Sequence, residues 1–380
     1  ISASSRMRTA RVAVCGAGWW SQGWHLPHLA RNPRSKIAAI VEPNPRPLSA
    51  ISTLEDVVQL GERYQVPTFS SVEEMLSSPT GKEIDGVLVC TPHRTHAHIA
   101  HAALAAGAHV LMEKPMTTNV SEAYNLLSAV DSAAPLAFMV NNTANWRPQA
   151  RIASDALAKG KLGSVEHIMC CMHSPLIWLF DDPVNEGWTR PTAGMLGNGF
   201  GWGQLSHLLA WVFGVTPLKP IEVFASMSHS AASGADMTDA AIIKCANADG
   251  TPVSISLSGS ASVPGNAHAH DNAHSVGKRV EVRIFGTNGM LAYGGDDQNP
   301  KSGCLELRTR SGEVSILHPE FAFENYEAEG TGPESLQSFI SACVGEPYYN
   351  AADAWVGLQT VRVLEAMYKS ASSGRVERVA

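Results

Sequence analysis

A glycine-rich turn near the N-terminus has the spacing needed to bind phosphate groups. The apolar stretch 11–16 leads into Gly16-Ala17-Gly18-Trp19-Trp20-Ser21 and an expected helix. In this G-x-G-x-x-S spacing the first glycine permits a tight turn, the second lets a pyrophosphate approach the backbone, and the serine permits close helix packing. The helix N-terminus adds amide donors and a positive dipole. We therefore predict a dinucleotide site at Gly16, Gly18, Trp19, Trp20 and Ser21, the alternative being a turn without a nucleotide.

Glu42 ends the next expected strand, 36–43, where an acidic side chain can accept hydrogen bonds from the adenosine ribose. Because a carboxylate repels a 2′-phosphate, Glu42 favours NAD. Arg46 is close enough in sequence to keep NADP open.

Lys114 lies at the carboxyl end of the expected strand 109–115. Doubly wound sheets bind their ligands in the crevice at this end of the strands. An ammonium group there can bind a reacting hydroxyl and stabilise the alkoxide charge that develops as a hydride leaves. The alternative is an ordinary surface lysine at a strand end.

The run CTPHRTHAHIAHAALAAGAHVLMEKPM, residues 90–116, resembles the Gfo/Idh/MocA family of NAD(P)-dependent oxidoreductases, named after glucose-fructose oxidoreductase and inositol dehydrogenase. The resemblance continues in GKLG at 160–163 and in EAMYKSASSGRVERV at 365–379, so it covers nearly the whole chain. It implies that Thr91, Pro92 and His96 border the nicotinamide side of the cofactor. It also implies that Glu113 and Lys114 form the catalytic centre and that Pro115 follows a cis bond.

The second catalytic motif that the resemblance implies is a glycine-rich turn, an aspartate and, four residues later, a histidine on the same helix face. The stretch 197–207 ends in His207, which matches, but Gly203 stands at the aspartate position. Either His207 works with Lys114 alone, or Gln204 or an acidic residue elsewhere substitutes, or activity has been lost. A histidine suits proton removal during alcohol oxidation; a buried structural histidine is the alternative.

The segment FDDPVNEGWTRPT, 180–192, combines carboxylates with an aromatic ring and a guanidinium group. Aromatic faces stack on sugar C–H groups, and charged groups fork between vicinal hydroxyls. We predict a substrate wall for a polyol, although a solvated surface loop has the same composition. The predicted substrate-binding residues are Trp146, Arg147, Trp188, Arg190, Trp202 and Gln204.

Two groups of histidines have compositions that suit a metal, but we predict no metal site. His93, His96, His98 and His101 fall at the start of a helix and do not share one face. The other group, His268, His270, Asp271 and His274, lies in a Gly/Asn/Ala-rich loop that we interpret as a mobile loop over the active site.

The order of apolar and helical patterns predicts two domains. Up to about residue 142 short apolar runs alternate with helical stretches, which is typical of a parallel sheet with helical crossovers. Later strands are separated by turn residues. We therefore expect an α/β Rossmann domain at 1–142, and an α+β domain with a large, mostly antiparallel open sheet, for substrate binding and oligomerisation, at 143–380.

The composition of the chain limits the classes of binding partner that we expect. Of 380 residues only 17% are charged, and the net charge of -7 argues against a nucleic-acid partner. The low charge favours a homodimer or homotetramer. No apolar stretch approaches the roughly 20 residues of a membrane span. Seven cysteines without a C-x-x-C pair fit a reduced, cytoplasmic location.

These observations together predict an NAD(P)-dependent sugar or polyol dehydrogenase. Its hydride would pass between the nicotinamide and a secondary alcohol or ketone carbon of a sugar, cyclitol or glycoside, with Lys114 and His207 as the catalytic pair. Two alternatives stay open. One is a glycosidase that uses NAD by transient oxidation, and the other is a regulatory protein that binds the nucleotide without turnover, which the missing aspartate at 203 favours.

Overall fold

The computed structural model describes residues 8–192, 194–264, 277–324 and 329–380. Its chain divides into two compact units. The first consists of the described residues within 1–117, 121–141 and 326–354, and the second of those within 118–120, 142–325 and 355–380.

The first unit contains a parallel sheet. Its strands are buried and almost wholly apolar, as β4 shows with four buried residues in succession. All adjacent strands pair in parallel, which confirms the expected Rossmann-type sheet. Among the described residues the order is β3-β2-β1-β4-β5-β6, with bounds β1 Ala10–Cys15, β2 Ser35–Val41, β3 Thr68–Phe69, β4 Gly86–Val89, β5 His109–Met112 and β6 Phe138–Val140.

Helices of the first unit begin at polar caps where the sequence supplies them. Asp56 and Gln59 form a reciprocal capping box at the start of α2, and the Ser71 hydroxyl accepts from the Glu74 amide at the start of α3. The helical segments are η1 Ser21–His25, α1 Leu26–Arg31, α2 Val57–Tyr64, α3 Val72–Ser77, η2 Gly81–Glu83, η3 His93–Thr95, α4 His96–Ala105, α5 Val120–Ser132 and α10 Glu334–Cys343.

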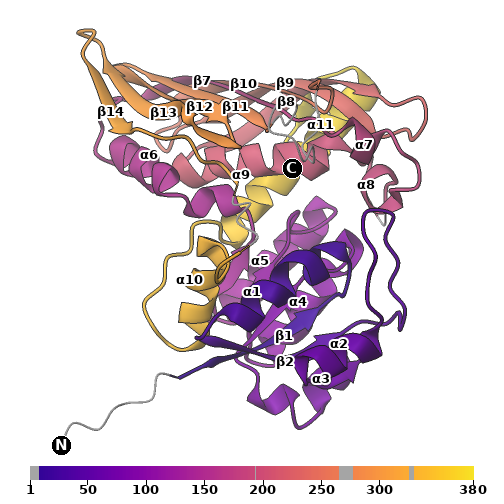
Figure 1. Ribbon diagram of the computed structural model, residues 1–380. Coiled ribbons are helices and arrows are strands. Elements are labelled where there is room, and N and C mark those ends of the chain that lie inside the picture. Colours follow the sequence, from indigo (N-terminus) through magenta and orange to yellow (C-terminus); the bar gives the residue numbers. More distant parts are fainter. Residues whose placement is uncertain (1–7, 193, 265–276, 325–328) are drawn as a thin grey trace, which may run out of the picture. The chain divides into compact units, whose positions relative to one another are not determined.

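Helix α10 comes from late in the chain but packs on the first unit's sheet, beside α1 in Figure 1. A Cβ on Gly86 of β4 would lie 2.6 Å from the ring of Phe339 and 2.7 Å from Sγ of Cys343, so the helix touches the strand directly. The sequence pattern predicts a second domain over residues 143–380. The described residues within 326–354 instead join the first unit, because α10 buries its apolar face on that sheet.

The second unit contains a larger sheet. Its neighbours pair in antiparallel fashion except β10 with β7, which confirms the expected mostly antiparallel sheet. Burial alternates along the strands, so one face is covered; α6 and α9 lie along it in Figure 1. Within the described residues the order is β14-β13-β12-β11-β7-β10-β9-β8-β15, with bounds β7 Val165–His173, β8 Lys219–His229, β9 Asp236–Ala246, β10 Pro252–Ser260, β11 Arg279–Gly286, β12 Gly289–Asp296, β13 Asn299–Thr309, β14 Val314–His318 and β15 Glu377–Arg378.

Helix α9 of this unit is apolar on all sides and almost completely buried. Helix α11 ends at Gly374, whose φ of +68° is the left-handed conformation that favours glycine. The helical segments are η4 Thr143–Trp146, α6 Pro148–Ala158, α7 Ile177–Phe180, α8 Glu186–Thr189, η5 Gly201–Leu205, α9 Ser206–Val215 and α11 Ala354–Ser373.

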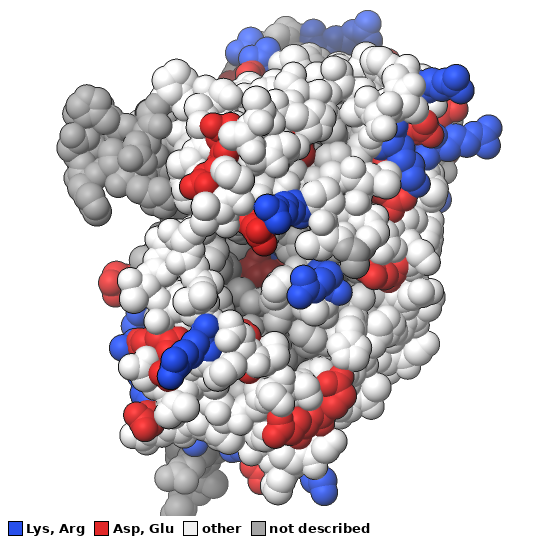
Figure 2. Space-filling view, turned by 90° about the vertical axis from the view of Figure 1, so that its right-hand side faces the viewer, with Lys and Arg blue, Asp and Glu red and all other residues white. Residues whose placement is uncertain are grey.

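Charges of both signs are interspersed on the face shown in Figure 2, with much uncharged surface between them. Where the chain is described, no helix combines the length and apolar character of a membrane span. The seven cysteines all lie within the described residues and carry free thiols.

Candidate functional site

The glycine-rich turn is built as a cradle in the first unit. Gly16 has φ +99°, and a Cβ there would lie 2.0 Å from the carbonyl oxygen of Cys90. Both the backbone conformation and the close approach of β4 therefore require glycine. A Cβ on Gly18 would meet no described atom within 4 Å. The turn thus packs tightly on the sheet at Gly16 and is open at Gly18, which is where a pyrophosphate needs access.

Glu42 lies directly against this turn. Its Oε2 accepts from the Ala17 amide at 2.8 Å, and its Oε1 accepts from the Asn44 amide at 3.0 Å. A carboxylate offers about four acceptor positions, so these two bonds leave capacity for hydroxyl donors. The geometry fixes a negative charge beside the turn.

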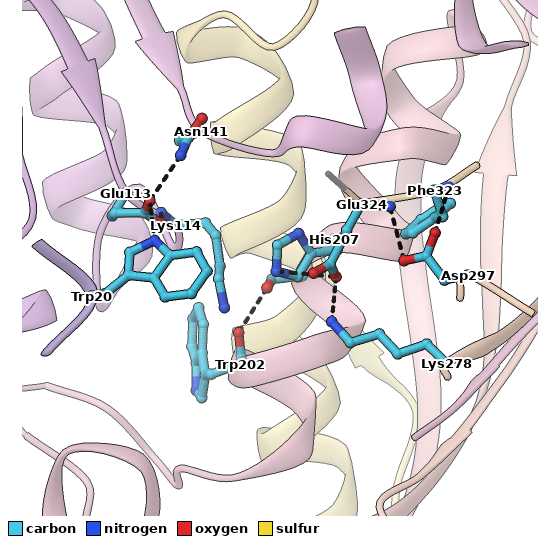
Figure 3. A network of polar contacts seen from close by, with 11 residues as sticks. Trp20, Glu113, Lys114, Asn141, Trp202, His207, Lys278, Asp297, Phe323 and Glu324 are labelled. Atoms are coloured by element: carbon cyan, nitrogen blue, oxygen red, sulfur yellow. Dashed lines mark hydrogen bonds and ion pairs between the residues drawn. The ribbon is translucent and has the colours of Figure 1, made fainter. Parts of the chain in front are cut away.

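Glu113 follows β5, and its carboxylate accepts hydrogen bonds from two other segments, the helix after the glycine-rich turn and the residues after β6. Its Oε1 accepts from Trp20 Nε1 at 3.1 Å, His25 Nε2 at 2.8 Å and Asn141 Nδ2 at 2.7 Å. Burial opposes ionisation of this carboxyl, but the hydrogen bond and charge of His25 together with Asn141 and Lys114 lower its pKa to about 2. Figure 3 shows Trp20 and Asn141 directed at this carboxylate. Glu113 is therefore an anion in a closed polar network.

Two members of that network were not predicted from the sequence, His25 and Asn141. Asn141 follows β6, so it lies at the same carboxyl edge of the sheet as Glu113. The order of the strands would therefore have been enough to predict that Asn141 lies near Glu113. Its Oδ1 accepts from the hydroxyl of Ser335 at 2.6 Å, and Ser335 belongs to α10. No local pattern predicts that last contact.

His96 is completely buried and joins two main-chain segments. Its Nδ1 lies 2.8 Å from the Pro115 carbonyl oxygen and its Nε2 lies 3.0 Å from that of Thr91. Burial lowers its pKa, although both carbonyls oppose that shift. The Lys114–Pro115 peptide bond is cis, as the resemblance implied. His96 thus holds the Thr91–Pro92 turn against the segment that carries Lys114, and its predicted role toward a cofactor stays a prediction.

His93 was considered in the sequence only as one of four clustered histidines. Its ring packs edge-on against His96, with centroids 5.6 Å apart. Burial, then the charges of His96 and Lys114, lower the pKa of His93 to about 3, and only the charge of Glu113 opposes them. The structure therefore adds a neutral imidazole to the surroundings of Lys114 and Glu113.

The histidine group 93–101 does not converge. His98 points to the surface and pairs with Glu73 at 2.7 Å, whereas His96 is turned to buried carbonyls. His268, His270, Asp271 and His274 lie outside the described residues. In the part of the chain that is described, no three His, Cys, Asp or Glu side chains are arranged to hold a metal ion.

The second unit places His207 in the first turn of α9, against a carboxylate. Its Nε2 lies 3.6 Å from Oε1 of Glu324, and Lys278 Nζ lies 2.5 Å from the same oxygen. The side chains of His207, Glu324 and Lys278 are 7%, 10% and 11% exposed, respectively. Figure 3 shows Glu324 between the other two. Sequence reasoning missed Glu324 and Lys278, because no motif or spacing in the sequence links either residue to His207.

Asp297 shapes the segment that carries Glu324. Its two carboxylate oxygens accept from the amides of Phe323 at 2.7 Å and Glu324 at 3.0 Å. Burial and the neighbouring charge of Glu324 raise the pKa of Asp297 to about 7, against the opposing amides and Lys278. Arg147, a predicted substrate residue, donates from Nη2 to the Glu324 carbonyl at 2.9 Å. Arg147 and His207 therefore belong to one buried polar cluster.

Other predicted substrate residues occupy different surroundings. Trp202 is 1% exposed and stacks on Tyr368, with ring centroids 6.0 Å apart. Trp188 is half-buried, edge-on to Phe180. Arg190 is exposed and pairs with Glu186 at 2.8 Å. The remaining two, Trp146 and Gln204, are buried. Their roles toward a substrate stay predictions.

An aspartate pair anchors the turn before α9, and the sequence did not reveal it. Asp236 accepts from the Gly201 amide and from the Tyr368 hydroxyl, both at 2.6 Å. Asp239 is buried beside it, and burial followed by the charge of Asp236 raises the Asp239 pKa well above its usual value. Asp236 therefore connects β9, α11 and the turn that leads into the helix of His207.

Residues 10–141 match an oxidoreductase family described as Gfo/Idh/MocA, with an NAD-binding Rossmann fold. The resemblance to that family is thus confirmed for this part of the chain. Among relatives, an uncharacterized oxidoreductase of Synechocystis is 26% identical over 291 residues, which is 75% of this chain and 72% of the relative. The 1,5-anhydro-D-fructose reductase of Ensifer adhaerens is 24% identical over 320 residues, 82% of this chain and 83% of the relative.

A solved structure extends the likeness of fold to the whole chain. The apo scyllo-inositol dehydrogenase from Lactobacillus casei has a TM-score of 0.69 and 18% identity, over 98% of this chain and 99% of its own. The chain therefore has the same fold as that structure, and within the described residues this fold combines a Rossmann-type parallel sheet with a large, mostly antiparallel sheet.

Proposed function

We propose that this protein is an NAD-dependent oxidoreductase that transfers hydride between the nicotinamide and a secondary alcohol or ketone of a sugar, cyclitol or glycoside. The observation that carries the proposal is the cradle at Gly16 and Gly18, with Glu42 held on its Ala17 amide. The similarity to a 1,5-anhydro-D-fructose reductase and to a scyllo-inositol dehydrogenase supports the substrate class.

The residues of the cradle fit a dinucleotide. The open side of Gly18 and the following amides would receive the pyrophosphate, and Glu42 would accept from the adenosine ribose hydroxyls. The negative charge of Glu42 disfavours a 2′-phosphate, so NAD is the proposed cofactor and NADP the less favoured one. When bound, the nicotinamide supplies a hydride acceptor or donor for the carbinol carbon.

The proposed catalytic residues are Lys114 and His207. Lys114 donates a hydrogen bond to the reacting oxygen and stabilises the negative charge that grows there as the C–H bond breaks. His207 accepts the hydroxyl proton during oxidation and returns it during reduction. Glu113 stays ionised, and the charge of Lys114 is one of the causes that lower its pKa.

The experiment is a screen of sugars, cyclitols and glycosides with NAD+ and with NADP+, following NADH absorbance and product mass together. The proposal expects a product two mass units lighter than its substrate, formed in step with NADH, and loss of turnover in Lys114→Ala with dinucleotide binding retained. Glycoside cleavage without net NADH would instead show the transient-oxidation glycosidase. Dinucleotide binding without turnover on any substrate would show a regulatory protein, the alternative that the missing aspartate at position 203 favours.

A further inference from the structure

Position 203 has no room for a side chain. A Cβ on Gly203 would lie 2.7 Å from Cζ and 3.0 Å from Cε1 of Phe180, and Phe180 is completely buried. The aromatic ring cannot move without displacing core neighbours such as Phe200, whose ring contacts it edge-on. The carboxylate expected one helical turn before His207 is therefore excluded by packing.

Another carboxylate reaches the same histidine from a distant segment. Glu324 follows β14 by six residues, and its Oε1 lies 3.6 Å from Nε2 of His207. This separation exceeds a hydrogen bond but is an ion-pair distance for a protonated imidazole. We propose that Glu324 is the residue that positions and polarises His207, in place of the aspartate that Gly203 lacks. The inference deepens the proposed function and rests on it for the role of His207 in proton transfer.

Glu324 is held firmly enough to act in this way. Lys278 binds its side chain, Arg147 binds its carbonyl, and Asp297 accepts from its amide. Three contacts from three segments fix both main chain and side chain of a residue that is 9% exposed. A positioning carboxylate requires such restraint, because a mobile one would not orient the ring.

The charges around His207 determine in which direction each substitution should move its titration midpoint. Glu324 favours the imidazolium, and Lys278 disfavours it by sharing the same carboxylate oxygen. Arg147 adds a positive charge, and Asp297 adds a negative charge once it ionises. Removing Glu324 and removing Lys278 should therefore move the titration of His207 in opposite directions, which loss of packing alone would not do.

The test titrates His207 by NMR in the full-length protein with labelled histidine, the His207 signal being assigned by its loss in His207→Gln. Glu324→Gln should lower the midpoint by about 1 pH unit, and Lys278→Met should raise it. The control Glu320→Gln, an exposed carboxylate in the same segment, should leave the midpoint unchanged. Glu324→Asp should restore part of the wild-type value.

An unchanged midpoint in Glu324→Gln, or shifts of the same sign in both variants, would overturn the inference. If Glu324→Gln does not fold, Lys278→Met alone tests the inference. An unchanged His207 midpoint in Lys278→Met would also overturn it. The acidic limb of the kcat/KM pH profile should follow the titration. The titration needs neither cofactor nor substrate, so a failed substrate screen removes the proposed function and leaves the pairing result readable.

Discussion

His25 donates from Nε2 to Oε1 of Glu113 at 2.8 Å, with the imidazole 2% and the carboxylate 13% exposed. The two residues are 88 positions apart, one in the helix after the glycine-rich turn and the other after β5. The contact therefore ties the proposed cofactor cradle to the segment that carries Lys114.

This contact predicts a dependence of stability on acid. The pKa of Glu113 in the folded protein, about 2, is below its usual 4.5, so its ionised form stabilises the fold above pH 4.5 and this contribution is lost as pH falls toward 2. The full effect is on the order of 3 kcal/mol. Urea unfolding at pH 7 and pH 3 should show a smaller difference for Glu113→Gln than for the wild type. An equal difference in both proteins would contradict the assignment.

His93 should remain neutral from pH 8 to pH 5. Its folded pKa of about 3 lies below its usual 6.5, so the unfolded chain binds the extra proton and stability falls as pH drops from about 6.5 toward 3. NMR should find its ring signals constant over that range. A His93 midpoint near 6.5 would show that its environment is not as described.

Replacing Glu42 should alter cofactor choice. Glu42→Ser removes the acceptor of the Ala17 and Asn44 amides and the negative charge that disfavours a 2′-phosphate. Loss of the charge-assisted hydrogen bonds from the ribose hydroxyls to Glu42 costs about 1.5–3 kcal/mol, so NAD binding should weaken by roughly tenfold to a hundredfold. The affinity for NADP should rise relative to that for NAD. Calorimetric titration measures both constants, with the exposed Glu62→Gln as the matched control. Unaltered NAD affinity in Glu42→Ser would remove Glu42 from the site.

Restoring the carboxylate at position 203 should harm the protein. Gly203→Asp forces Cβ against the buried ring of Phe180, and overpacking of this kind costs about 1–3 kcal/mol. Urea unfolding should show that loss, and Gly203→Asp combined with Phe180→Leu should recover part of it. If the single variant were as stable as the wild type, packing would not explain why glycine stands there.

Several features of the site are encoded by short stretches of the sequence. The G-x-G-x-x-S turn, Glu42 and the segment around Lys114 depend on residues close in sequence. The structure places the turn after β1, Glu42 directly after β2 and Lys114 shortly after β5. The parallel strand pattern predicted the sheet of the first unit, although the two-residue strand β3 is too short to show a pattern.

The sequence by itself determined the strand-turn-helix cradle, the two kinds of sheet and the glycine in place of an aspartate at position 203. It could do so because strand periodicity, glycine spacing and caps act over a few residues. Only the tertiary structure decided that α10 covers the first sheet, that Phe180 fills the space at Gly203, and that Glu324 reaches His207. These contacts join residues that are 23 positions apart for Phe180 and Gly203, 117 for His207 and Glu324, and 253 for Gly86 and Phe339. They depend on how apolar faces pack, which neither period nor propensity encodes.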